Sequence, residues 1–189
     1  MTQRSLPWQL VIGGLCVVAG AVILLLVVID RAREPKHPLV QNRVAARVSP
    51  KGFGEIAVWV TDASGRLRKR CLLEARTERQ RERGLMEVTD RTLGGHDGMV
   101  FLFDQDERGG FWMRNTPMPL SIAYFNRAGR IVSSTDMSPC RDSSNCPAYP
   151  PAGPYRSTIE VPHGRLAELG IGPGSRIRVG GRCDGAETS

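Results

Sequence analysis

Apolar residues follow two patterns in this chain: one unbroken run near the start, and a series of short alternating runs after residue 54. The unbroken run covers residues 10–29 and contains no charged side chain. An α-helix of that length spans roughly 30 Å, the thickness of the hydrocarbon core of a bilayer. The run is longer than the apolar core of a typical signal peptide, and no small-residue cleavage site follows it directly. We therefore predict an uncleaved transmembrane helix at 10–29, preceded by the short segment 1–9.

The alternating runs predict short strands, each bounded by turn residues. The first two strands are joined by the turn Asp62–Gly65, which makes a hairpin. The expected strands are 55–61, 66–75, 99–103, 121–125, 130–135, 156–161 and 176–179. A charged helix capped by Thr77 and Gly84 and a second short helix at 163–169 complete the pattern. Many short strands with two brief helices predict a mainly β domain over residues 54–180, built as a small barrel-like or sandwich domain.

The segment between the apolar run and the domain, 30–53, holds prolines and scattered charges without apolar periodicity, so we expect a linker there. A flexible tail is expected at 181–189. Five basic side chains in 30–49 against one in 1–9 would place the domain in the cytoplasm by the positive-inside rule. That rule weakens when a long domain follows the helix. Because of the cysteines discussed next, we predict a single-pass protein of the cytoplasmic membrane with an extracytoplasmic domain.

Two of the five cysteines, Cys140 and Cys146, lie close together in an irregular loop. A disulfide can close this short ring, and disulfides persist outside the cytoplasm. A soft-metal site made by both thiolates with Met137 is the alternative. We expect Cys71 to be a small core residue, and Cys183 to lie in the frayed tail.

The stretch 110–120 joins an apolar half to a polar half that is followed by two prolines. We predict a central strand leading into a proline-fixed turn, with Arg114–Thr116 at the end of the strand. These polar groups either satisfy buried backbone or bind a ligand or partner. The candidate binding residues of the chain are Trp112, Arg114, Asn115, Thr116, Tyr149 and Glu160.

Charge and metal-ligating residues add few constraints. The net charge of +7 is dispersed, with one local group at Arg66–Arg70. No zinc-finger spacing, helix-turn-helix pattern or RNA-binding signature accompanies it, so we expect no nucleic-acid partner, and anionic lipid headgroups explain the charge equally well. His96 and Asp97 offer metal-ligating atoms, but we expect a glycine-rich loop with a solvated histidine. No metal or cofactor is predicted.

Several stretches together resemble the DUF192 family of uncharacterised bacterial and archaeal proteins: Arg83–Met86, Gly98–Phe103, Phe111–Leu120, Pro139–Tyr149, Ile159–Gly164 and Gly170–Gly174. The resemblance covers about residues 55 to 180, and the F-W-M-x-N-T-x-x-P-L signature is its specific part. It implies a compact, mainly β, barrel-like domain, often carried behind a signal sequence or an anchor, and it supplies no established activity. The family usually has Asp after Pro-Leu, where this chain has Ser121, so any ligand or base role of that carboxylate would be missing here.

Three classes of function are compatible with these features. We favour a non-enzymatic, membrane-anchored binding or accessory module that presents Arg114–Thr116 to a small ligand, glycan or protein. The second class is a hydrolase or transferase with Asp136 or Glu160 as general base, although no G-x-S-x-G or H-E-x-x-H motif accompanies them. A strongly raised carboxyl pKa in a cleft would favour that class. The third is copper handling, which would need thioethers to converge at one open point, from Met86, Met99, Met113, Met118 and Met137.

Overall fold

The computed structural model describes residues 47–141 and 145–183. The predicted transmembrane helix at 10–29, most of the linker and most of the tail lie outside these residues. In the part of the chain that is described, no helix has the length and apolarity needed to cross a membrane.

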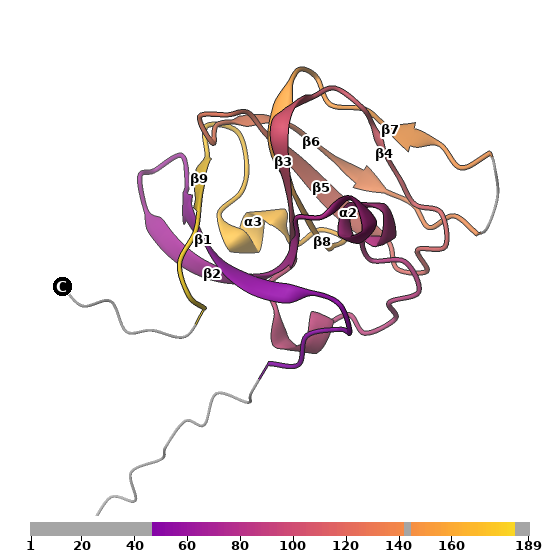
Figure 1. The fold of residues 1–189 in the computed structure, drawn as a ribbon. Helices are drawn as coiled ribbons and strands as arrows, with labels where there is room; N and C mark the ends of the chain where they lie inside the picture. Colours follow the sequence, from indigo (N-terminus) through magenta and orange to yellow (C-terminus); the bar gives the residue numbers. More distant parts are fainter. Residues whose placement is uncertain (1–46, 142–144, 184–189) are drawn as a thin grey trace, which may run out of the picture. The chain divides into compact units, whose positions relative to one another are not determined.

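Seven strands form one curved sheet in the order β6-β5-β8-β3-β2-β1-β9 (Figure 1). Neighbouring strands are antiparallel except β2 and β3, which are parallel. The hairpin of β1 and β2 has the predicted turn. The strands are β1 (Gly54–Thr61), β2 (Leu67–Ala75), β3 (Met99–Glu107), β5 (Leu120–Phe125), β6 (Ile131–Met137), β8 (Tyr155–Pro162) and β9 (Arg176–Val179). The mainly β prediction is therefore confirmed.

The sheet does not close into the predicted barrel. Its edge strands, β6 and β9, meet only through one isolated bridge between Arg130 and Arg176. Two hydrogen bonds make this bridge, from the Ile177 amide to the Gly129 carbonyl at 2.8 Å and from the Ile131 amide to the Ser175 carbonyl at 3.2 Å. Because β9 has only four residues and β6 has seven, β9 is too short to pair with the full length of β6.

Alternation along the strands gives two apolar clusters, one on each face of the sheet. One cluster is built around Leu73, Phe101, Ile122 and Tyr124. The other is built around residues directly before or after these in the sequence, whose side chains point to the opposite face. The second cluster includes Val58, Val60, Leu72, Val100, Ala123, Phe125, Ile159 and Val161. Strand β5 is buried along its whole length and β8 nearly so, because both faces of the sheet are covered there.

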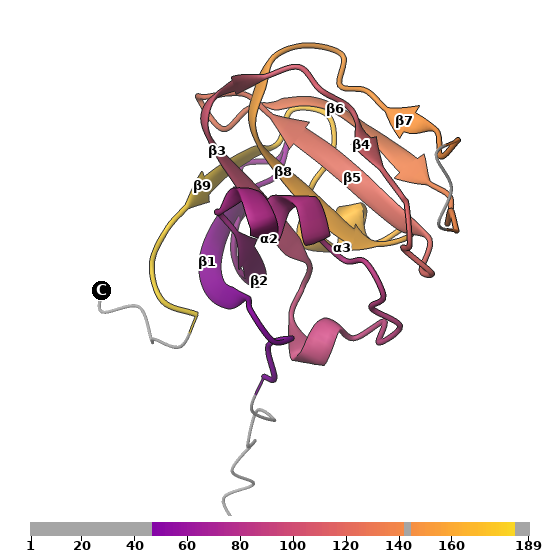
Figure 2. The ribbon, with the colours of Figure 1, turned by 45° about the vertical axis from the view of Figure 1, so that its right-hand side comes forward.

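Two short α-helices, α2 (Glu78–Arg83) and α3 (Leu166–Leu169), and the 3-10 turn η1 (Leu93–Gly95) lie outside the sheet (Figure 2). Helix α2 begins at the predicted N-cap, where Thr77 and Gln80 form a capping box, and ends at Gly84. It has no buried residue and leads into the buried Leu85. Helix α3 buries Leu169 in the second cluster.

The stretch 110–120 is not a central strand. Before Leu120, where β5 begins, only Phe111–Trp112 (β4) forms a strand, and it pairs with Ala148–Tyr149 (β7) in a separate two-stranded sheet. The chain then turns, because Asn115 has a left-handed φ of 53° and the Thr116 amide bonds the Met113 carbonyl at 3.0 Å. The central positions of the main sheet belong to β8, β3 and β2.

Two disulfides are present among the described residues. The predicted bond between Cys140 and Cys146 is confirmed, whereas Cys71 is not an unpaired core residue, because it is bonded to Cys183. Backbone pairing of β1 continues past β9: the Gly180 amide donates to the Ala57 carbonyl at 2.9 Å, so the end of the chain runs beside β1. This continuation brings Cys183 to Cys71, the cross-strand neighbour of Ala57.

Candidate functional site

A cavity of about 230 Å³ opens between α2, β3, β4 and β8; we call it the Glu160 cavity. Its walls are mostly aromatic and apolar, with the charged residues of α2 at one side. The lining residues that the argument uses are Arg81, Glu82, Phe103, Phe111, Trp112, Thr116, Tyr155 and Glu160. The cavity is smaller than the pockets that hold drug-sized ligands, which makes it a site for a small molecule.

Glu160 lies in the middle of the main sheet, between Met99 on β3 and Ile122 on β5. The alternation of β8 turns Ile159 and Val161 to the opposite face, as the sequence predicts. The residue is 4% exposed, and no hydrogen bond or charge within 47–141 or 145–183 contributes to the pKa of its carboxyl group, which is shifted by burial alone. Burial raises its pKa to about 8, so the carboxyl is mainly neutral at pH 7.

A second polar group without a partner lies two positions away on the same strand and face. The hydroxyl of Thr158 is buried and has no hydrogen-bond partner among the described residues. Buried polar groups are hydrogen-bonded in most proteins, and exceptions call for a specific explanation. Of these two groups, only the Glu160 carboxyl lines the cavity, and it favours a site whose partner is a bound molecule.

Aromatic rings build the wall around this carboxyl. Phe111 meets Phe101 edge-on, with ring centroids 5.0 Å apart, and Tyr155 meets Phe103 and Tyr124 in the same way at 5.4 and 5.0 Å. The Tyr155 hydroxyl donates to the Gly109 carbonyl at 3.0 Å, and burial raises its pKa to about 12. The wall is thus a rigid set of neutral rings, which packs well against apolar or C–H surfaces.

Two arginines of α2, Arg81 and Arg83, contact backbone carbonyls and aromatic rings of the domain itself. The guanidinium of Arg81 lies 4.9 Å from the centre of the Phe103 ring and donates to the Leu102 carbonyl at 3.1 Å. Arg83 donates to the Lys51 carbonyl at 2.6 Å and lies over the Phe53 ring. These contacts fix the helix at the cavity edge.

A second, more open cavity of about 780 Å³ lies around Asn115, Glu87 and Arg141. Two non-glycine residues on its edge have left-handed backbones: Glu87 at φ 61° and Asn115 at φ 53°. They are joined by a hydrogen bond of 2.8 Å from the Glu87 amide to the Asn115 carbonyl. Such backbone conformations cost of order 1–3 kcal/mol each, and they often occur at functional sites.

The six candidate residues are divided between these places. Trp112, Thr116 and Glu160 line the Glu160 cavity, where Trp112 is 55% exposed; Thr116 also lines the second cavity, with Asn115. Arg114 forms an isolated β-bridge with Cys140 through the backbone and lines neither cavity. Tyr149 is structural, because its carbonyl accepts from the Tyr124 hydroxyl and its own hydroxyl accepts from the Ser138 amide at 2.9 Å. The predicted Arg114–Thr116 face is therefore not one site.

Asp136, the other candidate general base, belongs to a different group of side chains. Its carboxylate accepts a hydrogen bond from Ser121, its cross-strand partner, and lies 3.2 Å from His163 Nε2. Ser121 also accepts from the Gly164 amide at 2.9 Å. The carboxylate, 63% exposed, stands between the serine and the histidine, so the histidine cannot act as base on the serine as in a catalytic triad.

Two further predictions concern metals. Met99, Met113, Met118 and Met137 are buried in the first apolar cluster, so these thioethers act as core filler rather than meeting at an open point. The prediction that His96 is solvated is wrong, because this residue is only 3% exposed. Its ring nitrogens contact Leu93 and Glu55 instead, since η1 folds the glycine-rich loop back onto β1.

Sequence reasoning missed the aromatic wall and the α2 edge of the cavity. Phe101 and Phe103 alternate on β3, and period-2 spacing alone assigns them to one face. The sequence holds no signal that brings Arg81 and Tyr155 to the same cavity, because that depends on how α2 packs on the sheet.

Comparisons with known proteins agree with this architecture. The family model of DUF192, described as "Uncharacterized ACR", matches residues 60–179. A Sinorhizobium meliloti 1021 protein named "putative transcription regulator" is 26% identical, with a TM-score of 0.57, over 71% of this chain and 98% of its own. A Novosphingobium aromaticivorans DSM 12444 protein of unknown function is 31% identical, with a TM-score of 0.56, over 71% of this chain and 94% of its own. No curated protein matches. The chain belongs to the DUF192 family.

Proposed function

We propose that this domain is a non-enzymatic binding module that holds a small, hydroxylated ligand such as a sugar or polyol in the Glu160 cavity. The observation that carries the proposal is the buried carboxyl group of Glu160, which has no partner within the described residues and lies beside aromatic rings. A neutral carboxyl offers one O–H donor and one carbonyl acceptor. A ligand hydroxyl can use both, and the C–H face of a sugar ring packs against aromatic rings.

The half-exposed Trp112 supports the same ligand class. It stands at the cavity with 55% of its surface exposed, one of the large apolar side chains left in solvent in the described domain. Aromatic side chains combine a large apolar surface with little conformational entropy, which suits them to contact ligands. A polar ligand would satisfy the carboxyl while its apolar side covers the indole.

The test is a binding titration of monosaccharides, polyols and primary carboxamides by ligand-observed NMR and calorimetry. Glu160→Met removes the hydrogen-bonding group and keeps the apolar volume, so we expect at least a tenfold loss of affinity, and a smaller loss for Glu160→Gln. The matched control is Asn115→Ala, at the second cavity, which should bind as the wild type does. Equal affinities for Glu160→Met and wild type would refute the proposal.

A second candidate, a hydrolase, has one specific observation in its favour. A carboxyl with a pKa near 8 stays protonated at neutral pH and can act as general acid, and Glu82 offers a further carboxylate at the cavity. Chromogenic glycosides and esters test it. Turnover that falls as pH rises past about 8 and is lost in Glu160→Gln would favour catalysis, whereas no turnover with measurable ligand binding would favour the binding module.

We further propose that the domain is displayed outside the cytoplasm on the predicted membrane helix at 10–29. Both disulfides support an oxidising compartment. Intact cells treated with a membrane-impermeant alkylating reagent test this. Labelling of Cys140 and Cys146 only after reduction supports the proposal, and labelling without reductant after cell lysis alone would place the domain in the cytoplasm.

A further inference from the structure

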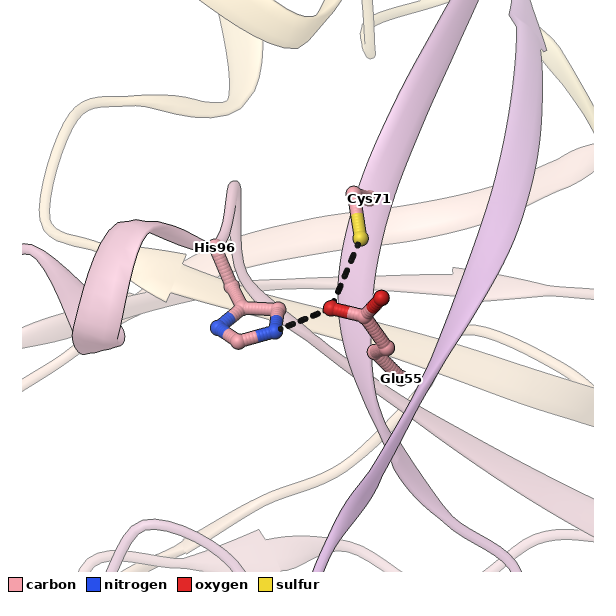
Figure 3. Close-up of side chains that lie close together, drawn as sticks. All are labelled: Glu55, Cys71 and His96. Atoms are coloured by element: carbon pink, nitrogen blue, oxygen red, sulfur yellow. Dashed lines mark hydrogen bonds and ion pairs between the residues drawn. The ribbon is translucent and has the colours of Figure 1, made fainter. Parts of the chain in front are cut away.

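Three side chains with metal-ligating atoms converge beside the β1–β2 hairpin (Figure 3). Glu55 lies on β1, Cys71 on β2, and His96 in the loop after η1. The Glu55 Oε2 atom is 2.9 Å from His96 Nε2 and 3.5 Å from Cys71 Sγ. The three ligand atoms lie within 4.8 Å of one another. Segments separated by up to 41 residues therefore place an oxygen, a nitrogen and a sulfur at one point.

The orientation of His96 is typical of a metal-binding histidine. Its side chain is fully buried, and its Nδ1–H donates to the Leu93 carbonyl at 2.8 Å. A backbone carbonyl in this place commonly fixes the tautomer of a ligating imidazole. The other nitrogen, Nε2, faces the carboxylate of Glu55. Since both ring nitrogens face oxygen acceptors, the space between Nε2 and Oε2 has to hold a cation, either a proton or a metal ion.

A fourth donor is covalently attached to the cluster. Cys71 is bonded to Cys183, and their Cα atoms lie 5.2 Å apart. Reduction of this disulfide yields two thiols next to Glu55 and His96. Thiolates bound to one tetrahedral Zn²⁺ lie about 3.7 Å apart, as Zn–S bonds of about 2.3 Å require, and side-chain rotation brings these two sulfurs to that spacing. Two sulfurs, one nitrogen and one oxygen are a donor set that suits zinc.

Arg47 balances the charge of such a site. Two thiolates, one carboxylate and a neutral imidazole around Zn²⁺ carry a net charge of −1. The Arg47 guanidinium donates to Glu55, with Nε 3.0 Å from Oε2 and a terminal nitrogen 3.5 Å from Oε1. When the metal takes Oε2, Arg47 keeps Oε1 and neutralises the excess charge.

We propose that Glu55, Cys71, His96 and Cys183 form a redox-gated Zn²⁺ site that is closed in the disulfide form and binds one ion in the reduced form. A dithiol reductant gives two electrons and two protons to the disulfide and becomes a disulfide itself. Zn²⁺ then binds, and three protons leave to solvent: the two thiol protons and the proton held between His96 Nε2 and Glu55 Oε2. The proposal is independent of the ligand suggested for the Glu160 cavity.

Cobalt titration of the full chain in detergent tests the site. Cys16, Cys140 and Cys146 are replaced by Ser, so that only the pair of interest remains. A phosphine reduces that pair and is oxidised to its oxide with oxygen from water, and unlike a dithiol it does not compete strongly for the metal. We expect one Co²⁺ per reduced chain, with thiolate-to-cobalt charge-transfer absorption and tetrahedral d–d bands, and displacement by Zn²⁺. Uptake by the oxidised chain, or none by the reduced chain, would overturn the proposal.

Variants decide which residues hold the ion. His96→Gln should weaken cobalt binding at least tenfold. The matched control is His163→Gln, because His163 also lies beside a carboxylate, Asp136, at 3.2 Å, and it should bind as the parent does. Equal affinities of the two variants would overturn the proposal.

A second variant covers the case in which His96→Gln fails to fold. Cys183→Ser changes a residue beyond the last strand, and near-ultraviolet circular dichroism of Trp59 checks its fold. We expect the thiolate-to-cobalt absorption to fall by about half. Unchanged absorption would overturn the assignment.

Discussion

Replacing Glu160 by Gln should change how the stability of the domain depends on pH. The native carboxyl has a pKa of about 8, against 4.5 for the unperturbed group. Between these values the native state keeps a proton that the unfolded state has lost, so the stability of the wild type falls as pH rises. Below pH 4.5 both states are protonated and burial of the carboxyl carries no ionisation cost.

The size of the effect follows from the pKa difference. Each pKa unit corresponds to about 1.4 kcal/mol. The shifted pKa of Glu160 therefore lowers the free energy of unfolding of the wild type by about 3 kcal/mol at pH 7 and by about 5 kcal/mol above pH 8. The amide of Gln does not ionise and escapes this cost. We therefore expect Glu160→Gln to gain stability relative to wild type by about 1.4 kcal/mol per pH unit between pH 4.5 and 8, with no further gain above pH 8.

Urea denaturation at several pH values from 5 to 9, with the disulfides intact, measures these free energies of unfolding. The slope decides the question, because any packing difference between Gln and Glu shifts all pH values equally. Glu82→Gln removes a carboxylate from the exposed α2 side of the same cavity and controls for net charge. Parallel profiles for wild type and Glu160→Gln would refute a neutral, buried Glu160.

Three further predictions concern stability, each measured as a free energy of unfolding. Cys183→Ser removes the Cys71–Cys183 disulfide and should cost about 5 kcal/mol, whereas Cys146→Ser removes the other disulfide and should cost about 2 kcal/mol. The difference arises because the first disulfide closes a much longer loop of the unfolded chain. Equal costs would contradict this chain-entropy argument. Gly129→Ala should cost more than about 3 kcal/mol, because φ is +70° and the new Cβ would lie 2.1 Å from the Ile177 carbonyl oxygen. Gly65→Ala, at φ +83° with no atom near the new Cβ, should cost only about 1–2 kcal/mol. Similar costs for the two variants would count against the close approach at Gly129. Thr77→Ala should cost about 1 kcal/mol by removing the N-cap of α2, and no loss would argue against the capping box.

Sequence patterns predicted the hairpins and helices that are determined by residues close together in the chain. The β1–β2 hairpin follows from alternation and from the Asp62–Gly65 turn, where the Asp62 carboxylate accepts from the Ser64 and Arg66 amides at 3.0 Å. Helix α2 follows from its caps. The short spacing of Cys140 and Cys146 permits a disulfide, which was the expectation, with a soft-metal site as the alternative.

The features that escaped prediction depend on contacts between distant segments. Cys71 and Cys183 are 112 residues apart, and only the continued pairing of the chain end with β1 brings them together. His96 is buried because η1 turns it toward Glu55, which the glycine-rich sequence does not reveal. Phe111 and Trp112 have strand-forming side chains, yet the left-handed Asn115 and the following prolines end the strand after two residues.

Glu160 shows what could be foreseen about the candidate site. Its alternation with Ile159 and Val161 predicts that it faces away from them, and the structure agrees. Its register partners on β3 and β5, Met99 and Ile122, are apolar, and burial is the cause of its raised pKa.

The most direct test of the central claim is chemical-shift mapping of a bound monosaccharide or polyol on the isotope-labelled protein. We predict the largest changes at Phe111, Trp112, Tyr155 and the Glu160 side-chain carboxyl carbon, the residues that line one cavity. Changes centred on Asn115 and Arg141, or no saturable change with any hydroxylated ligand, would contradict binding at the Glu160 cavity.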